Sequence, residues 1–442
     1  MLKITSFFLL IFTVASAASA QSPATFNKLK LDSLIKTVGA KDKAMMSIAV
    51  MQNGKMVYSK AVGYAIADTK IPATPETKYR IGSITKVFTG TVIFQLIQEG
   101  KLSLTTTLAT FFPALPNADK ITMAHLLNHS SGLFNLTSDP GYASILGAKL
   151  SQADLLARFQ HAPVFEPGAK NEYSNTNFIL LGFIIEKLDK KSYAASVKSR
   201  IIDKIGLKNT YYGGPINPAN NEARSYKWKE GWVAEQETDM SIPGAAGAMV
   251  ANPGDLVQFF NALFTGKLIS EASLLQMEKI TNGYGMAMFK MSFGEHSSYG
   301  HTGGIDGFQS QAAYFPENKM AIAITANGVN TSLNDVAIGV LSILFNKPYV
   351  IPTFSNLKLK NEDLNKYLGT YASDKMPLKI TITSKDAVLY AQATGQSAFP
   401  LVAAKPDVFT FESAGINLTF DVANNQMTFR QGGATFVMTK EK

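Results

Sequence analysis

The chain has 442 residues, 46% of them hydrophobic and 17% charged, so it can bury a large core and is not a disordered segment. Because it contains no cysteine, disulfide bonds, thiol nucleophiles and zinc sites built on Cys are excluded. The formal net charge is +9, but the basic residues are scattered, which favours an ordinary charged surface and no nucleic-acid partner.

Residues 1–20 have the pattern of a secretory signal peptide. Lys3 gives the positive start, residues 7–14 form an apolar run, and residues 18–20 are a small-residue cleavage site, so Gln21 is expected to begin the mature chain. A membrane anchor is the alternative, but the run is short for a bilayer, which needs about 18 apolar residues or more. We therefore expect an exported protein, periplasmic or secreted, without a stable membrane anchor.

The first structure expected after the signal is a β-hairpin. Residues 44–50 form an apolar run typical of a strand, Asn53-Gly54 is a turn signal, and residues 56–61 suit the return strand. The long stretch that follows reads as mainly helical and rich in loops.

The first candidate site motif places Ser83 and Lys86 in one turn of an expected helix. An apolar row with a four-residue spacing follows, and Gly100 is a typical helix end; the row is Ile84, Phe88, Val92 and Leu96. Side chains three positions apart share a face, and the free N–H groups of a first turn favour negative charge. A neutral Lys can take the Ser proton, and lowering its pKa from about 10.4 to about 7.4 requires ~4 kcal/mol, which burial can supply. The S-x-x-K pattern is common by chance, however, and recurs at residues 355–358 without a following apolar helix.

The second candidate motif is Tyr173-Ser174-Asn175, between a turn at residues 167–168 and an apolar helix expected over residues 178–188. Tyr can transfer a proton, and Asn can hold a substrate amide or orient the Lys. Alternatively, Ser174 or Asn175 simply caps the following helix. For this motif taken alone, the capping role is favoured.

The third candidate motif is His301-Thr302-Gly303-Gly304, just before a hairpin expected from residues 307–315 and 320–326. Its glycines let another chain or a ligand approach the backbone, and N–H groups on a strand edge can stabilise an oxyanion. The alternative is a glycine-rich turn with an incidental His.

Two domains are expected. Strands at both ends of residues 21–346 enclose a helical middle, and an amphipathic helix over residues 330–345 closes this part, which predicts an α+β fold with one sheet built from distant segments. Residues 347–354 contain two prolines and read as a linker. Residues 355–442 hold short runs separated by turn residues, which predict a small antiparallel barrel or sandwich; the runs are 378–383, 387–393, 408–412, 416–421, 426–430 and 434–439.

Taken in order, the three motifs resemble those of the penicillin-recognising serine hydrolase superfamily, in which a Ser-x-x-Lys motif is combined with two others. The likeness is to the branch of class C β-lactamases, D,D-carboxypeptidases, D-aminopeptidases and related esterases, whose Y-x-N and H-x-G motifs are matched at residues 173–175 and 301–303. It covers residues 30–345, with supporting likenesses at 126–133, 165–168 and 247–259. The C-terminal part looks like the lipocalin-like β-domain that some members carry.

The resemblance implies a β-lactamase/transpeptidase-like antiparallel sheet flanked by helices, with a helical lobe beside it and the site between them. It implies acylation of Ser83 followed by hydrolysis, with Lys86 and Tyr173 sharing the proton transfers. The N–H groups of Ser83 and Gly304 would form the oxyanion hole. The implied substrate contacts are Asn175, His301, Thr302 and Gly303, and neither a cofactor nor a metal is implied.

One departure from the family pattern bears on the substrate. The best-known β-lactamases of this group carry Lys where His301 stands, and a His with a pKa of about 6.5 is mostly uncharged at neutral pH. The site would then hold less fixed positive charge for a substrate carboxylate. His125 and His129 are expected to be structural, while Tyr226, Trp228 and Trp232 either line the cleft or pack in a surface loop.

The predicted function is a serine hydrolase that acts through an acyl-enzyme on D-amino-acid-containing peptides or small esters. A class C β-lactamase and a catalytically silent protein that binds cell-wall peptides are the alternatives. The chain has no G-x-S-x-G elbow, and its five His residues lack metal-ligand spacing. The expected partner is a small-molecule or peptide substrate, with peptidoglycan fragments among the candidates, and the oligomeric state stays open.

Overall fold

The computed structural model describes residues 26–352, 354, 357, 359–411, 414–431 and 434–441. The expected signal segment and its cleavage site lie outside the described residues, as do Ser355 and Lys358 of the S-x-x-K copy at residues 355–358.

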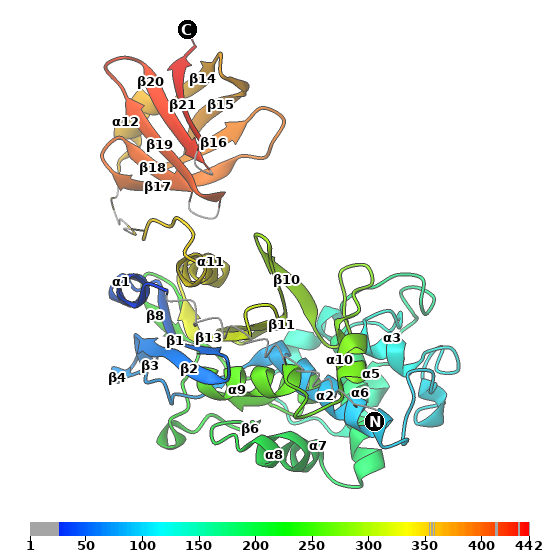
Figure 1. Ribbon diagram of the computed structural model, residues 1–442. Helices are drawn as coiled ribbons and strands as arrows, with labels where there is room; N and C mark the ends of the chain where they lie inside the picture. Colours follow the sequence, from blue (N-terminus) through cyan, green and yellow to red (C-terminus); the bar gives the residue numbers. More distant parts are fainter. Residues whose placement is uncertain are drawn as a thin grey trace, which may run out of the picture.

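One antiparallel sheet forms the centre of the first domain, with strand order β10-β11-β12-β13-β1-β2 (Figure 1). Strands β1 and β13 pair from Ala44↔Val329 to Gln52↔Met320, which confirms that the sheet joins distant segments. Both expected hairpins, β1–β2 and β12–β13, are present. The strands are β1 Ala44–Gln52, β2 Lys55–Val62, β10 Phe289–Phe293, β11 His296–Ile305, β12 Phe308–Phe315 and β13 Met320–Val329.

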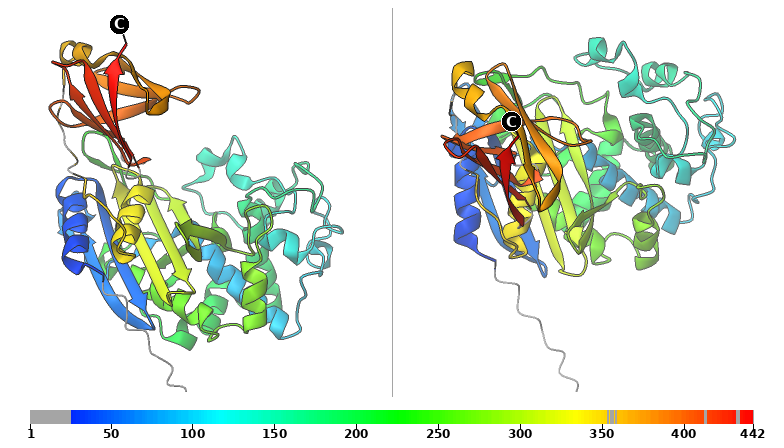
Figure 2. Two further views of the ribbon diagram at one scale, coloured as in Figure 1. Left: turned by 45° about the horizontal axis from the view of Figure 1, so that its top comes forward. Right: turned by 90° about the horizontal axis from the view of Figure 1, so that it is seen from above.

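Helices cover both faces of this sheet, so alternate residues of a strand reach two different cores. In β13, Ile322 and Ile324 face the core shared with α1 and α11, whereas Ala321 and Ala323 face the core of the helical lobe. Figure 2 shows α1 and α11 together on one side of the sheet and the lobe on the other. Strand β1 is buried along its whole length because it is covered on both faces.

Two long helices of the lobe, α2 and α6, each begin at one of the candidate motifs. Helix α2 is buried from Thr85 to Leu96, so it is covered by protein on every side. Both helices were predicted from the sequence, whereas α1, α9 and α10 were not. The helices of this domain are α1 Lys28–Ala40, α2 Thr85–Gln98, α3 Met123–Leu127, α4 Tyr142–Ile145, α5 Gln152–Arg158, α6 Asn175–Asp189, α7 Tyr193–Val197, α8 Asp203–Ile205, α9 Pro253–Phe264, α10 Glu271–Glu278 and α11 Leu333–Leu344.

Three smaller antiparallel sheets connect these long elements: β3 with β4, β5 with β9 and β6, and β7 with β8. Strand β5 ends directly before the turn that carries Ser83, and its pairing with β9 fixes that turn against the lobe. The short strands are β3 Tyr64–Ile66, β4 Ile71–Pro72, β5 Tyr79–Arg80, β6 Tyr211–Tyr212, β7 Tyr226–Trp228, β8 Trp232–Ala234 and β9 Met249–Ala251.

The C-terminal part is a closed antiparallel barrel whose strands β14 to β21 follow one another in chain order (Figure 1). The six predicted runs correspond to β15, β16 and β18 to β21, while β14 and β17 were missed. An aromatic group that includes Tyr367, Phe409 and Phe420 fills the interior. The elements are α12 Asn361–Leu364, β14 Gly369–Ser373, β15 Met376–Lys385, β16 Val388–Ala393, β17 Phe399–Lys405, β18 Val408–Phe411, β19 Ile416–Asp421, β20 Gln426–Gln431 and β21 Ala434–Lys440.

The segment expected to be a linker packs against the first domain. Tyr349 and Ile351 lie on the core shared by α1 and α11, and Phe354 is buried in it. The Lys43 ammonium lies 5.6 Å from the centre of the Phe354 ring. The exact domain boundaries stay a prediction, with α11 ending at Leu344 and the first barrel strand beginning at Gly369.

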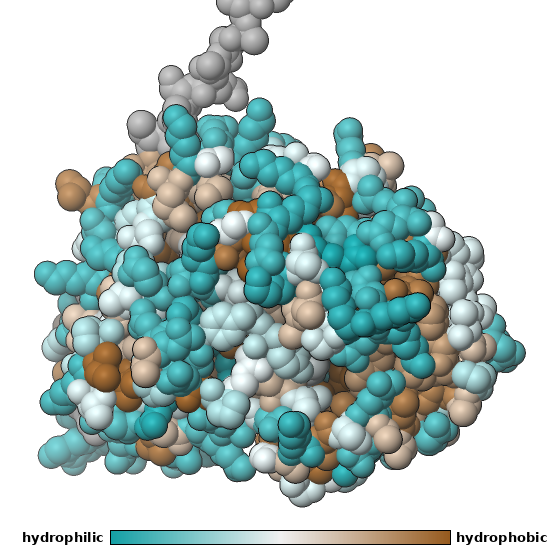
Figure 3. Space-filling model, turned by 90° about the horizontal axis from the view of Figure 1, so that it is seen from below, coloured by the Kyte–Doolittle hydropathy of each residue, from teal (hydrophilic) through white to brown (hydrophobic). Residues whose placement is uncertain are grey.

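Within the described part of the chain, no helix combines the length and the apolar character needed to cross a membrane. On the face drawn in Figure 3, hydrophilic residues cover most of the surface, and hydrophobic residues are most continuous at the lower right of the view.

Candidate active site

Ser83 lies in a single 3₁₀ turn, Gly82–Ile84, between β5 and α2. The turn needs a glycine at its start: Gly82 has φ 49°, and a Cβ on it would lie 2.7 Å from Gly304 N. Lys86 follows in the first turn of α2 and is completely buried. The sequence therefore places the partly exposed Ser83 hydroxyl next to the buried Lys86 amine.

Three oxygen atoms surround the Lys86 amine. Lys86 Nζ lies 2.9 Å from Ser83 Oγ, 2.8 Å from Asn175 Oδ1 and 2.7 Å from Ala246 O. Because no acid is among these partners, burial is the main influence on the amine and holds the pKa of Lys86 well below its ordinary value.

Tyr173 completes the group around Ser83. Its hydroxyl donates to Ser83 Oγ over 2.8 Å, and its ring stacks on His129 with centroids 4.4 Å apart. Burial raises the pKa of Tyr173, which outweighs the opposite effect of the bond to Ser83. The phenol is thus protonated at neutral pH.

These contacts fix the direction of the hydrogen bonds. A neutral amine has two N–H donors and one lone pair, and the Asn175 and Ala246 oxygens can only accept. Both N–H groups are then used, so the lone pair faces Ser83 and can accept the hydroxyl proton. In the uncharged form of Lys86, Tyr173 therefore donates to Ser83 and Ser83 donates to Lys86.

Asn175 sits at the first position of α6, where the sequence alone favoured a capping role. Ser174 occupies the N-cap position without a side-chain capping bond. Asn175 Oδ1 instead accepts a hydrogen bond from the Lys86 amine. The amide nitrogen of Asn175 lies 3.4 Å from Asn135 Oδ1. Of the two roles expected from chemistry, orienting the Lys is the one its contacts support.

Strand β11 brings the third motif beside Ser83. A Cβ on Gly303 would lie 2.0 Å from Ile81 O, so the two backbones touch here, as expected for a glycine at this position. At Gly304 a Cβ would meet only Phe308 O at 3.9 Å, so the space beside this residue is open, and the expected approach of a ligand there stays a prediction.

The hairpin register turns the Gly304 N–H away from β12. Ile305 and Phe308 close a two-residue turn, and Gly304 pairs with Gln309. In antiparallel pairs, hydrogen-bonded and non-hydrogen-bonded positions alternate, and the pair that closes a two-residue turn is bonded. Gly304 therefore falls at a non-bonded position, with its N–H pointing away from β12 and toward the Gly82 turn.

His301 and Thr302 lie on opposite faces of β11. His301 is buried beside Phe289 and Tyr173. Its Nδ1 contacts Thr302 O, which can only accept, so Nδ1 carries the proton. Burial lowers the pKa of His301 to about 3, and the ring is neutral. The Thr302 side chain is exposed and lies opposite Gln311 on the α11 face.

The remaining predicted residues have structural contacts. His129 Nδ1 accepts from the Ser174 N–H, and His125 forms a capping box with Thr122. Tyr226 is buried and bonded to Asp68, and Trp228 packs edge-on against Trp232, so the packed-loop alternative fits these three aromatic residues.

Sequence reasoning missed the Ala246 carbonyl and Asn135. A backbone carbonyl has no sequence signal of its own, although Ala246 lies just before the stretch at residues 247–259 that supported the family likeness. Among the described residues, no group of three or more His, Cys, Asp or Glu side chains is arranged to hold a metal ion.

The chain is similar to several known proteins. A family model described as "Beta-lactamase" matches residues 31–343. Penicillin-binding protein 4* of Bacillus subtilis (strain 168) is 25% identical over 448 aligned positions, which cover 92% of this chain and 97% of that protein.

Two solved structures extend the likeness to three dimensions. The D-amino acid amidase of Ochrobactrum anthropi SV3, complexed with D-phenylalanine, is 28% identical with a TM-score of 0.65, covering 72% of this chain and 99% of that one. The octameric penicillin-binding protein homologue of Pyrococcus abyssi covers 93% of this chain and all of its own, with a TM-score of 0.67 and 24% identity, and it supports the fold alone.

Proposed function

Because this chain belongs to the beta-lactamase family and is a serine hydrolase, we propose that Ser83 is its nucleophile and forms an acyl-enzyme with an amide or ester substrate. The observation that carries the proposal is the set of hydrogen-bond contacts that links Tyr173 through Ser83 to the buried amine of Lys86, whose pKa burial lowers. Nucleophile and base lie within the reach that such catalysis needs.

Each step has a group in place. Lys86 takes the hydroxyl proton while Ser83 Oγ bonds to the substrate carbonyl carbon. The N–H groups of Ser83 and Gly304 then stabilise the negative oxygen. The carbon–nitrogen or carbon–oxygen bond breaks, and the leaving group takes a proton from Tyr173, which is replaced by the one held on Lys86. Water hydrolyses the acyl-enzyme by the same steps in reverse.

The electrostatics of the site support uncharged amides and esters over substrates that need a cation for their carboxylate. Burial lowers the pKa of His301 to about 3, so this ring supplies no positive charge next to Ser83, and burial also disfavours the charged form of Lys86. The likeness to a D-amino acid amidase points the same way. Peptidoglycan fragments outside the cytoplasm are candidate substrates, in keeping with the signal pattern of residues 1–20.

Replacing the nucleophile tests the proposal. We expect Ser83→Ala to abolish both turnover and covalent labelling by a fluorophosphonate or β-lactam probe. The matched control is Ser174→Ala, which removes a nearby buried hydroxyl that has no hydrogen-bond partner and should leave both intact. Wild-type activity in Ser83→Ala would refute the assignment.

A substrate panel addresses the specificity. D-amino-acid amides and p-nitrophenyl esters should give higher kcat/KM than nitrocefin, with D-alanyl peptides as the carboxylate-bearing comparison and L-amino-acid amides as the stereochemical control. A labelled but inactive protein across the whole panel would favour the silent binding protein instead.

A further inference from the structure

A buried ion pair, Arg80–Asp306, lies beside both backbone segments that supply the proposed oxyanion donors, and it has no part in the steps above. Arg80 ends β5, three positions before Ser83, and Asp306 lies in the β11–β12 turn, two positions after Gly304. Arg80 Nη1 donates to Asp306 Oδ2 over 2.8 Å. The two side chains are only 2% and 3% exposed, so the pair connects these distant segments in the interior.

Further hydrogen bonds leave neither partner free to move. Arg80 also donates to the carbonyl oxygens of Thr238 and Gly214 and to Glu237 Oε2. Asp306 Oδ1 accepts from the N–H and the hydroxyl of Thr238. The Asp306 backbone has φ 54°, a left-handed conformation that these contacts hold in place.

The segments that the pair connects are in direct contact. Gly303 packs on Ile81 O without room for a side chain, and Ser310 Oγ donates to the same carbonyl oxygen over 2.8 Å. Gly304 N is the atom nearest to a Cβ built on Gly82. A shift of the β11–β12 turn would therefore change the distance between the N–H groups of Gly304 and Ser83.

We propose that Arg80 and Asp306 are positioning residues of the oxyanion hole, which fix the spacing of its two N–H donors. This role rests on the proposed acyl-transfer function. Because preorganised donors act on the charge that develops in the transition state, their displacement lowers the rate more than it weakens substrate binding.

Two variants test the role. Asp306→Asn keeps the shape of the side chain and a residue type that tolerates the left-handed backbone conformation, but it removes the charge. Arg80→Gln removes the other charged partner of the pair. We expect kcat to fall about 10- to 100-fold in each, below the loss typical of a deleted donor, with KM changed less than about threefold. The inhibition constant of a boronic acid, which forms a tetrahedral adduct with Ser83, should rise by the same factor. Arg80→Lys, which keeps the charge, should recover part of kcat.

Two controls separate positioning from stability. Glu237→Gln removes the half-exposed carboxylate of the same cluster, and kcat should stay within about threefold of wild type. Arg200→Gln breaks another largely buried pair, with Asp189, in which the side chains are 14% and 4% exposed; it should lower stability without changing kcat or boronate affinity in folded protein.

The results separate the two proposals. If wild type turns over substrate but folded Asp306→Asn matches its kcat and boronate affinity, the positioning role is wrong and the proposed function stands. A change confined to KM would also contradict the role. If Arg80→Gln does not fold, Asp306→Asn decides alone. If wild type neither labels nor turns over substrate, the proposed function itself fails.

Discussion

Lys86 can act as a base only when it is uncharged, and its surroundings favour that state. Burial lowers its pKa, and the same burial raises the pKa of Tyr173. Lys86 therefore loses its charge at a lower pH than a free Lys, whereas Tyr173 keeps its proton to a higher pH than a free Tyr. Burial thus moves the two pKa values in opposite directions. In this arrangement Lys86 can act as the base and Tyr173 as the acid.

This separation predicts the pH dependence of the reaction. With an ester that has no ionisable group, kcat/KM should fall as the pH decreases and one proton binds Lys86, at a pH below the ordinary range of a Lys, whereas Tyr173 should keep its proton to beyond about pH 10. Lys86→Ala should lower kcat/KM by about 10²–10⁴-fold and remove the acid limb. Tyr173→Phe should lower kcat and keep that limb. Steady-state kinetics across pH would contradict the assignment if the acid limb were unchanged in Lys86→Ala.

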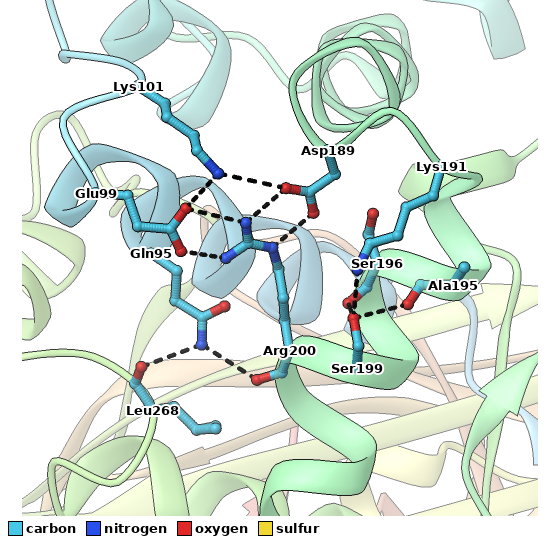
Figure 4. A network of polar contacts seen from close by, with 10 residues as sticks. All are labelled: Gln95, Glu99, Lys101, Asp189, Lys191, Ala195, Ser196, Ser199, Arg200 and Leu268. Carbon is cyan, nitrogen blue, oxygen red and sulfur yellow. Dashed lines mark hydrogen bonds and ion pairs between the residues drawn. The ribbon is translucent and has the colours of Figure 1, made fainter.

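Among the secondary-structure elements, α2 and α6 carry the proposed groups at their N-terminal ends, and Arg200 joins their opposite ends (Figure 4). Arg200 lies in a π-helical turn, Lys198–Ile202. It donates to both oxygens of Glu99, just past α2, and to both oxygens of Asp189, the last residue of α6. A planar guanidinium can bind two carboxylates in this way because its N–H groups lie in pairs that match the two oxygens of a carboxylate.

Loss of this connection should destabilise the protein. Arg200→Ala leaves the Asp189 carboxylate, only 4% exposed, without its main partner, and breaking such a pair typically costs about 3–5 kcal/mol. Urea denaturation at neutral pH measures the change. Lys198→Ala, which breaks an exposed pair with Asp203, is the control and should cost less than about 1 kcal/mol.

The pH dependence of stability gives a second readout of this connection. Hydrogen bonds from Arg200 lower the pKa of Glu99 to about 2; burial raises the pKa of Asp189, but bonds to Arg200 and Ser196 bring it below its ordinary value. Groups with lowered folded-state pKa values stabilise the fold above about pH 4–5, and this stabilisation is lost as pH falls toward 2. Arg200→Ala should therefore lose less stability between these pH values than wild type; an equal loss would contradict the coupling.

The elements also show which parts of the structure the sequence could predict. Ser83 and Lys86 lie within one turn, and the helix after Tyr173 is a long apolar run, so local spacing was sufficient. Strand β17 was missed because Pro400 weakens a strand pattern, and β11 because its glycines have little strand propensity. Contacts such as Arg80–Asp306, which are 226 residues apart, depend on the pairing of distant strands and leave no local pattern.

The two parts of the whole molecule differ in how their contacts run along the chain. The first-domain sheet pairs β1 with β13 across most of that domain, whereas neighbouring barrel strands are mostly neighbours in sequence. The barrel has its own core, and the family match ends at residue 343, before the barrel begins. All residues of the proposed mechanism lie in the first domain, so the barrel is expected to have no direct part in the chemistry.

Two truncations should therefore behave differently. Removal of residues 359–442 keeps the packed segment up to Phe354, and kcat/KM for small amides or esters should stay within about threefold of the full chain. Removal of residues 347–442 also takes Tyr349, Ile351 and Phe354 from the core shared by α1 and α11. Since burial of one large apolar side chain contributes about 1.5–3 kcal/mol, this shorter chain should unfold at a distinctly lower temperature. Thermal unfolding and kinetics on both chains decide: a folded, soluble chain that ends at residue 358 but lacks activity would show that the barrel shapes the cleft.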